Sequence, residues 1–263
     1  MMFELPAEIT AYLSELDAFI EREIKPIEQR DDNIRFFDHR RENARTDWDN
    51  DGHPRADWWA LLAEMRAGAD KAGHYRFAIP TEFGGKDGSN LAMAAIRYHL
   101  AKKGLGLHND LQNESSIVGN LVQVLMLRDF GTEQQKRDFI PQMLAGKMGW
   151  SFGLTEEHHG SGATHMDTRA VPEVRDGVAG YLINGNKMWT TGLPYTSHVM
   201  TFARTNGEDG KARGITCFVV PTDAPGFEIG EYMWTFNMPT DHPKVKYTNV
   251  WVPESAILGK LDE

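Results

Sequence analysis

The sequence predicts an α+β protein, with an all-α helical domain over residues 1–149 followed by an all-β barrel or sandwich over residues 150–263. Before residue 150, apolar residues recur at spacings of three and four, which is the period of an amphipathic helix. After residue 150 they alternate, and the alternating runs are separated by turns rich in Gly, Pro and Asp. Few helical stretches lie between these runs, which argues against a doubly wound parallel sheet.

Composition and charge restrict the class of protein. The chain has 263 residues, of which 41% are hydrophobic and 25% charged, so it is large enough to bury a core in one or two domains. A formal net charge of -10 argues against a dedicated nucleic-acid or anionic-membrane surface. The N-terminus shows neither a signal peptide nor a membrane span, and Cys217 is a single cysteine, so a cytoplasmic protein without internal disulfides is expected.

The helical period predicts five helices in the first half. They are expected at residues 9–24 behind Pro6, 58–65, 91–98 behind Ser89, 117–125, and after Thr132 through Leu144. Thr132 stands three residues before Gln135, which is the spacing of a capping box. Residues 30–55 are polar and poorly periodic, so they are interpreted as a long surface excursion between the first two helices.

The second half reads as a series of strands. Residues 180–183 and 186–191 flank Asn184-Gly185, a dipeptide suited to a tight hairpin because both turn positions need positive φ. Further strands are predicted at residues 197–204, 215–221, 227–233 and 245–253.

Several motifs, in order, resemble those of the acyl-CoA dehydrogenase family. The main pair is WSFGLTEEHHGS from Trp150 and KMWTTG from Lys187. The likeness also includes IPTEFGGKDG from Ile79, GTEQQKRDFIPQMLAGKMG from Gly131, GSGATHMDT from Gly160, FVVPTDAPGFEIG from Phe218 and VWVPESAILG from Val250. It covers most of the chain except residues 30–55, and it implies the family's N-terminal helical and middle β domains.

The resemblance implies a flavin site that binds FAD. A flavin ring is flat and largely apolar, but its edge needs hydrogen-bond partners, which backbone amides and small hydroxyls supply. By resemblance, the cofactor-binding residues are Phe152, Leu154 and Thr155 along the ring and ribityl chain, Gly160 and Ser161 at the pyrophosphate, and Trp189, Thr190 and Thr191 around the ring.

The same resemblance suggests contacts with an acyl-CoA substrate. Ser161 is expected near the acyl-CoA, and Lys211 and Arg213 stand where the family often meets the CoA phosphates. Two basic residues in a charged turn are also commonly just solvated, so both interpretations of Lys211 and Arg213 remain open.

The reaction implied by resemblance is the α,β-dehydrogenation of an acyl-CoA thioester, as in the β-oxidation of fatty acids. A carboxylate removes the α-proton and the β-hydrogen passes as hydride to the flavin, whose electrons then leave to an electron-transfer flavoprotein. In the family the glutamate base lies in a C-terminal helical domain, and no acid of this sequence matches it. No catalytic residue is therefore assigned in this chain; Glu156 or Glu157 would be a speculative substitute.

Alternatives to a complete dehydrogenase remain. The chain could be a truncated dehydrogenase, one part of a split enzyme whose partner chain supplies the C-terminal helical domain, or a non-catalytic binding subunit of this fold. An acyl-CoA oxidase is a further alternative, because these residues do not reveal what reoxidises the flavin. The family's habit implies a homo-oligomer, either a dimer or a tetramer.

A cluster of possible metal ligands occurs at Glu156, Glu157, His158, His159 and His165. Adjacent histidines point apart on an extended chain, and the cluster lacks helical i, i+4 spacing and cysteines. We therefore predict a solvated loop without a metal.

Overall fold

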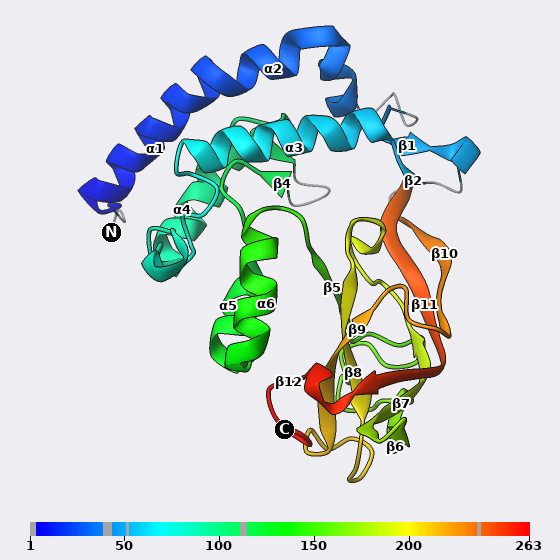
Figure 1. Cartoon of the computed structure of the whole chain (residues 1–263). Helices are drawn as coiled ribbons and strands as arrows, with labels where there is room; N and C mark the ends of the chain where they lie inside the picture. Colours follow the sequence, from blue (N-terminus) through cyan, green and yellow to red (C-terminus); the bar gives the residue numbers. More distant parts are fainter. Residues whose placement is uncertain (1–3, 39–43, 51–52, 111–114, 236–237) are drawn as a thin grey trace. The chain divides into compact units, whose positions relative to one another are not determined.

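The computed structural model describes residues 4–38, 44–50, 53–110, 115–235 and 238–263, in two compact units, Met1–Val122 and Gln123–Glu263. Helices dominate the first unit, and a sheet dominates the second (Figure 1), which confirms the predicted α+β class. The domain boundary expected at residue 150 stays a prediction. Within the described residues, no helix combines the length and apolar character that a membrane crossing needs.

Four α-helices form most of the first unit. Their bounds are α1 Ala7–Phe19, α2 Lys25–Gln29, α3 Ala56–Lys71 and α4 Asn90–Ala101, and a π-helical turn, Ile20–Ile24, joins α1 to α2. The helix expected behind Ser89 is present as α4, and the Ser89 hydroxyl caps it by accepting a hydrogen bond from the Ala92 amide at 3.1 Å. The apolar faces of these helices share one core, which includes Leu16, Trp58, Met65, Ile96 and Leu100.

The predicted helix over residues 117–125 begins later than expected. Ile117 and Val118 are fully buried but precede the helix, and α5 spans Val122–Phe130. The Gly119 amide donates instead to the Tyr75 carbonyl at 2.9 Å, and a Cβ on Gly119 would lie 2.8 Å from that oxygen. Burial of an irregular segment therefore produced an apolar run that resembled a helical stripe.

The described part of residues 30–55 is more than a surface excursion. It contains the 3-10 segments Arg30–Phe37 and Trp48–Asn50 and the short paired strands β1 Thr46–Asp47 and β2 His53–Pro54; residues 39–43 and 51–52 lie outside the description. Phe36 is buried, and its ring packs 5.1 Å from that of Trp58. Arg45 pairs at 2.8 Å with the buried Asp110 of β3, Asn109–Asp110, which pairs with β4, Ser115–Ser116. Tertiary packing, which local polarity does not reveal, orders this segment.

An eight-stranded sheet forms the second unit. Its strands are β5 Trp150–Gly153, β6 Arg169–Arg175, β7 Val178–Lys187, β8 His198–Arg204, β9 Ile215–Pro221, β10 Phe227–Thr235, β11 Met238–Pro253 and β12 Ile257–Leu258. The strand order is β10-β11-β7-β6-β8-β9-β12, and β5 pairs in parallel with β8. All four later strands that the sequence predicts are present, and β11 is longer than expected.

The predicted hairpin at Asn184-Gly185 is wrong. Residues 184 and 185 lie inside β7, and the tight turn is Asp176-Gly177, where both residues have positive φ and Arg175 pairs with Val178. Gly185 serves a different purpose, because a Cβ there would lie 2.4 Å from Thr168 Oγ1. A glycine needed for close backbone approach was thus mistaken for a turn residue.

Helix α6, Glu133–Leu144, begins at the predicted capping box and is hydrogen-bonded to the segment around β12. The predicted capping box is confirmed: Thr132 Oγ1 accepts from the Gln135 amide at 3.2 Å, and Gln135 Oε1 accepts from the Thr132 amide at 2.9 Å. The side-chain Nε2 of the buried Gln135 donates to the carbonyls of Ser255 at 3.0 Å and Ile257 at 2.8 Å. One side chain therefore joins α6 to the segment around β12.

Candidate functional site

The first motif lies where β5 leaves the sheet. β5 pairs with the first half of β8, while Arg169 at the start of β6 pairs with Arg204 at the end of β8. The loop between β5 and β6 therefore begins and ends on the same side of β8. In β5, Phe152 is the one exposed residue, at 43%, and its ring lies 5.0 Å from that of Phe202.

The two sequence motifs meet through the backbone. Leu154 and Thr155, both half-buried, follow β5, and the Thr155 carbonyl accepts a hydrogen bond from the Met188 amide at 2.9 Å. Met188 directly follows the end of β7 and precedes Trp189. The fold thus brings the residues around position 155 to those around position 189, although 33 residues separate Thr155 from Met188 along the chain.

The segment after β7 is held in an unusual conformation. Trp189 has φ 59°, which is rare for a bulky side chain, and its ring remains 37% exposed. β11 residues hold the segment: the Thr190 amide donates to the Pro243 carbonyl at 3.3 Å and the Gly192 amide to the Asp241 carbonyl at 3.0 Å. Strain of this kind is frequent at ligand sites, where the surrounding structure maintains it.

Thr190 and Thr191 present hydroxyls with different surroundings. The Thr190 side chain is fully buried, and its Oγ1 has no hydrogen-bond partner among the described residues. Thr191 is exposed, and its Oγ1 makes only a long 3.5 Å contact to the Trp189 carbonyl. Thr191 is therefore the hydroxyl that a bound ligand can reach, whereas the Thr190 hydroxyl has no accessible surface.

A buried ion pair lies behind this segment. Lys187 is 1% exposed, and its Nζ lies 2.7 Å from Glu156 Oε1 and 3.1 Å from the Leu154 carbonyl. Glu156, 5% exposed, also accepts from the Thr168 amide at 3.0 Å and the Asp167 amide at 2.6 Å. Each ion therefore has a charged partner and backbone partners, as buried charges require.

Burial and pairing act in opposite directions on these two ions. Burial by itself raises the pKa of Glu156, but hydrogen bonds from Lys187 and Thr168 outweigh it, so that the pKa lies below its usual value. Burial lowers the pKa of Lys187, and the contact with Glu156 opposes that shift. Glu156 is thus held as a carboxylate and is poorly suited to accept a substrate proton.

The loop between β5 and β6 is anchored near both ends and exposed in the middle. Glu156 and His159 exchange two backbone hydrogen bonds of 3.2 Å, and further along, His165 Nδ1 lies 2.7 Å from Asp209 Oδ2. Between these anchors, Gly160, Ser161 and Gly162 are exposed. A Cβ on Gly160 would meet nothing within 4 Å, and φ there lies outside the left-handed region, so packing within the chain does not require glycine.

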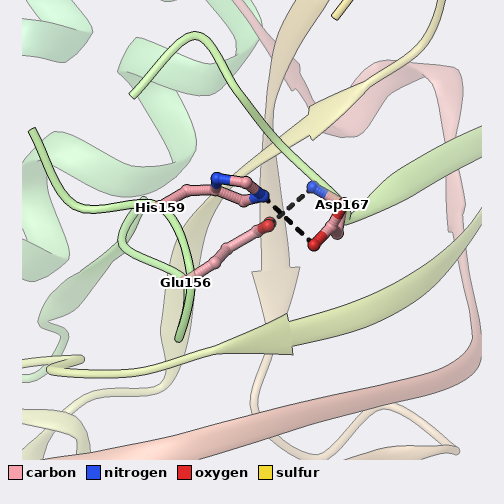
Figure 2. A group of neighbouring side chains, drawn as sticks. All are labelled: Glu156, His159 and Asp167. Atoms are coloured by element: carbon pink, nitrogen blue, oxygen red, sulfur yellow. Dashed lines mark hydrogen bonds and ion pairs between the residues drawn. The ribbon is translucent and has the colours of Figure 1, made fainter. Parts of the chain in front are cut away.

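Figure 2 shows the possible metal ligands that the fold gathers at this loop: Glu156, His159 and Asp167. His159 Nε2 lies 3.2 Å from Asp167 Oδ2, while His158 and Glu157 are exposed and do not join the three. The Glu156 carboxylate, however, is occupied by an ammonium group and two backbone amides. We therefore interpret this group as a hydrogen-bonded turn rather than as a set of metal ligands.

Lys211 and Arg213 lie in the loop between β8 and β9, with exposed side chains. Their carbonyls are bound by the buried Arg204, which also donates to the Thr164 carbonyl at 2.6 Å. Arg204 therefore links the loop that carries Ser161 to the loop that carries the two basic residues. Arg213 interacts electrostatically with Glu263, and within the described ranges no hydrogen bond holds either basic side chain.

Sequence reasoning missed the supporting residues Lys187 and Arg204, and it considered Glu156 only as a possible metal ligand or a substitute base. Lys187 stands at the start of KMWTTG, in a segment predicted to be a strand, but a lysine in a strand usually faces solvent, so the sequence did not indicate its burial. Arg204 had no such signal, because its four carbonyl partners are distant in sequence or in irregular loops.

The residues present fit a flavin. Exposed aromatic rings at Phe152 and Trp189 can contact a flat apolar ring, and the exposed Thr191 hydroxyl offers a hydrogen bond near it. The open space at Gly160 leaves room for a phosphate beside the backbone. These features are those of a site that binds a partly apolar, partly anionic ligand.

Comparison with known proteins agrees with this geometry. The sequence matches the acyl-CoA dehydrogenase N-terminal domain over residues 28–147 and the acyl-CoA dehydrogenase middle domain over residues 151–249. The chain therefore belongs to the acyl-CoA dehydrogenase family, whose members are flavoproteins. A similar relative is the mitochondrial short/branched chain specific acyl-CoA dehydrogenase of Rattus norvegicus, 32% identical over 186 residues.

The match to that relative covers 70% of this chain and 40% of the rat protein. Among solved structures, a putative acyl-CoA dehydrogenase from Mycobacterium abscessus aligns with a TM-score of 0.76 at 22% identity, over 99% of this chain and 62% of that one. The ChsE4-ChsE5 complex from Mycobacterium tuberculosis aligns with a TM-score of 0.70 at 22% identity, over 100% and 59%. These structures share the fold, and the chain spans less than two thirds of each of these three proteins.

Proposed function

We propose that this chain forms the FAD-binding part of an enzyme that dehydrogenates acyl-CoA thioesters. The observation that carries the proposal is the hydrogen bond between the Met188 amide and the Thr155 carbonyl, because it joins the two motifs expected to contact the flavin. Membership of the acyl-CoA dehydrogenase family supports the assignment of both cofactor and reaction.

Each motif residue has a distinct role in this proposal. Phe152, Leu154 and Trp189 present apolar contact to the flavin ring and exclude water from it. Thr155 and Thr191 supply hydroxyl or amide hydrogen bonds to its polar edge, and the buried Thr190 holds the backbone between Trp189 and Thr191 in place. Gly160 and Ser161 lie in the exposed part of the loop, where a phosphate can meet the backbone amides.

FAD, when bound, supplies the two-electron acceptor for the dehydrogenation. The α-proton of the thioester needs a carboxylate base, and Glu156 is excluded from that role because Lys187 and two backbone amides occupy it. Glu157, the next residue, is exposed on the loop. We therefore propose that residues outside this chain supply the base.

A second candidate is a split enzyme, in which a different chain completes the site. The likeness to a chain of the ChsE4-ChsE5 complex favours it, because that structure is a complex of two different proteins. A homo-oligomer, either a dimer or a tetramer, and an electron-transfer flavoprotein as acceptor are the other proposed partners. Ser161, Lys211 and Arg213 are the proposed contacts to the acyl-CoA.

The first test combines the intact mass of the purified chain with its visible spectrum. A flavin spectrum at about one FAD per chain supports the proposal, and a chain that cannot be loaded with FAD under any condition overturns it. Anaerobic addition of acyl-CoA thioesters of different chain length should then bleach the flavin when the missing base is present. Comparing a dye acceptor with oxygen distinguishes a dehydrogenase from an oxidase.

A further inference from the structure

Lys187 is the most buried cation in the described part of the β unit. Its side chain is fully enclosed, and its ammonium group contacts Glu156 Oε1 at 2.7 Å and the Leu154 carbonyl at 3.1 Å. Removing such a group from water costs several kcal/mol, and an apolar side chain of the same volume often gives equal or greater stability. Stability of the sheet is therefore a poor explanation for a lysine at this position.

The position of the pair in the chain suggests another role. Lys187 is the last residue of β7, so its backbone leads directly into Met188 and Trp189. Its ammonium group holds the Leu154 carbonyl, which lies between the end of β5 and Thr155. The lysine side chain therefore connects the two segments a second time, beside the hydrogen bond from Met188 to Thr155.

Glu156 extends this connection to a third segment. Its carboxylate accepts from the backbone amides of Asp167 and Thr168, immediately before β6. Ser161 and the adjacent glycines lie in the loop that these contacts close. Three backbone segments thus converge on one ion pair, as Figure 2 shows for Glu156 and Asp167.

We propose that Lys187 and Glu156 are positioning residues that hold the flavin-contacting segments 152–155, 160–161 and 189–191 in register with one another. This inference rests on the proposed flavin site. Directional hydrogen bonds from the pair to Leu154, Asp167 and Thr168 specify where each backbone lies, which apolar packing cannot do equally well. Neither side chain is exposed enough to touch the flavin, so both act through the backbone.

The experiment uses the full chain in its FAD-loaded and FAD-free forms. We compare the wild type with Lys187→Met, Glu156→Gln and the double variant, measuring FAD affinity, the fine structure of the bound flavin's visible band, and thermal unfolding without FAD. Gln135→Ala is the matched control. It removes a buried polar side chain from the same unit, far along the chain from the flavin motifs.

The single variants each leave one buried ion unpaired, so they should lose stability as well as FAD affinity. The double variant removes both charges and should recover much of the stability. Its FAD affinity should stay lower by roughly tenfold or more, the factor that loss of a supporting contact costs in other sites, and its flavin band should stay broadened. The control should lose stability and keep the wild-type band and affinity.

Recovery of affinity together with stability in the double variant would overturn the inference, because it would show a purely structural pair. Wild-type affinity and an unchanged band in Lys187→Met would do the same. A wild-type chain that never binds FAD would remove the proposed function as well. That result is distinct from one in which the wild type binds FAD and the pair proves irrelevant.

Discussion

The Met188 amide donates to the Thr155 carbonyl at 2.9 Å, so one backbone hydrogen bond joins the ends of β5 and β7. These strands are not neighbours in the sheet, because β5 pairs with β8 while β7 lies between β11 and β6. The contact therefore joins the ends of two strands that do not pair with each other. The aromatic and hydroxyl side chains expected to contact the flavin lie close to it along the chain.

Trp189 provides a direct test of the flavin placement. Trp189→Ala should weaken FAD binding about threefold to tenfold, because aromatic contacts of this kind contribute roughly 0.5–1.5 kcal/mol beyond area burial. Trp189→Gly should lose the same ring contact but unfold at a higher temperature than Trp189→Ala, since glycine relieves the positive φ. Equilibrium titration of FAD and thermal unfolding measure the two effects.

Trp251 offers a control for that prediction. Its indole donates to the Glu173 carbonyl at 3.3 Å, on the strands β11 and β6 and outside the flavin motifs. Trp251→Ala should lower stability and leave FAD affinity unchanged. Wild-type FAD affinity in Trp189→Ala would show that the motif is misplaced.

Gly160 separates a ligand role from a packing role. Gly160→Ala should change the free energy of unfolding by no more than about 0.5 kcal/mol, because the added methyl group meets open space. It should nevertheless weaken FAD binding if the phosphates approach this backbone. Gly68→Ala in α3 is the control, because its site is equally open and lies among none of the flavin motifs.

Isothermal titration of FAD into each cofactor-free chain measures this difference. Equal affinity in Gly160→Ala and the wild type would mean that the pyrophosphate lies elsewhere.

The carboxylate of Glu156 should make stability dependent on acid pH. Its pKa is lowered from the usual 4.5 in the folded chain, so its contribution is fully present above that value and is lost as the pH falls through the folded pKa. Glu156→Gln should therefore cost about 3 kcal/mol or more at neutral pH, and the difference from wild type should shrink below pH 4.5.

Urea unfolding of both proteins between neutral and acid pH measures that difference. Glu157→Gln, at an exposed neighbouring position, should stay close to wild type throughout. A difference for Glu156→Gln that is independent of pH would contradict the assigned ion pair.

Gln135 should matter far more than its neighbour. Gln135→Ala removes one half of the capping box and both hydrogen bonds to the carbonyls of Ser255 and Ile257, at a cost of about 2–3 kcal/mol. Gln134→Ala removes only exposed contacts to Arg137 and Asp138 and should cost about 0.5 kcal/mol or less. Denaturant unfolding compares the two, and similar costs would contradict the connection between α6 and the C-terminal strand.

Sequence patterns predicted the structure correctly where residues close along the chain determine it. The Thr132–Gln135 capping box was predicted from spacing alone, and a helix was expected directly behind Ser89, because each cap is closed within four residues. They failed where distant contacts decide it. Gly185 resembled a turn residue, yet it is needed because Thr168 lies against it.

The first half shows the same limit. Ile117 and Val118 resembled the start of a helix because burial makes any segment apolar, whereas contact with Tyr75 keeps the chain around Gly119 irregular. Phe36 lies in a polar stretch that carries no periodic signal, and only its packing on Trp58 reveals its burial.

The sequence alone determined the family, the helical-to-β change near residue 150 and the candidate flavin contacts, because these depend on motif identity and local period. Only the tertiary structure decided that the two motifs share a hydrogen bond and that Lys187 and Glu156 form a buried pair behind them. The physical reason is that a buried charge is tolerated only beside its partners. Which residues become those partners depends on the pairing of distant strands.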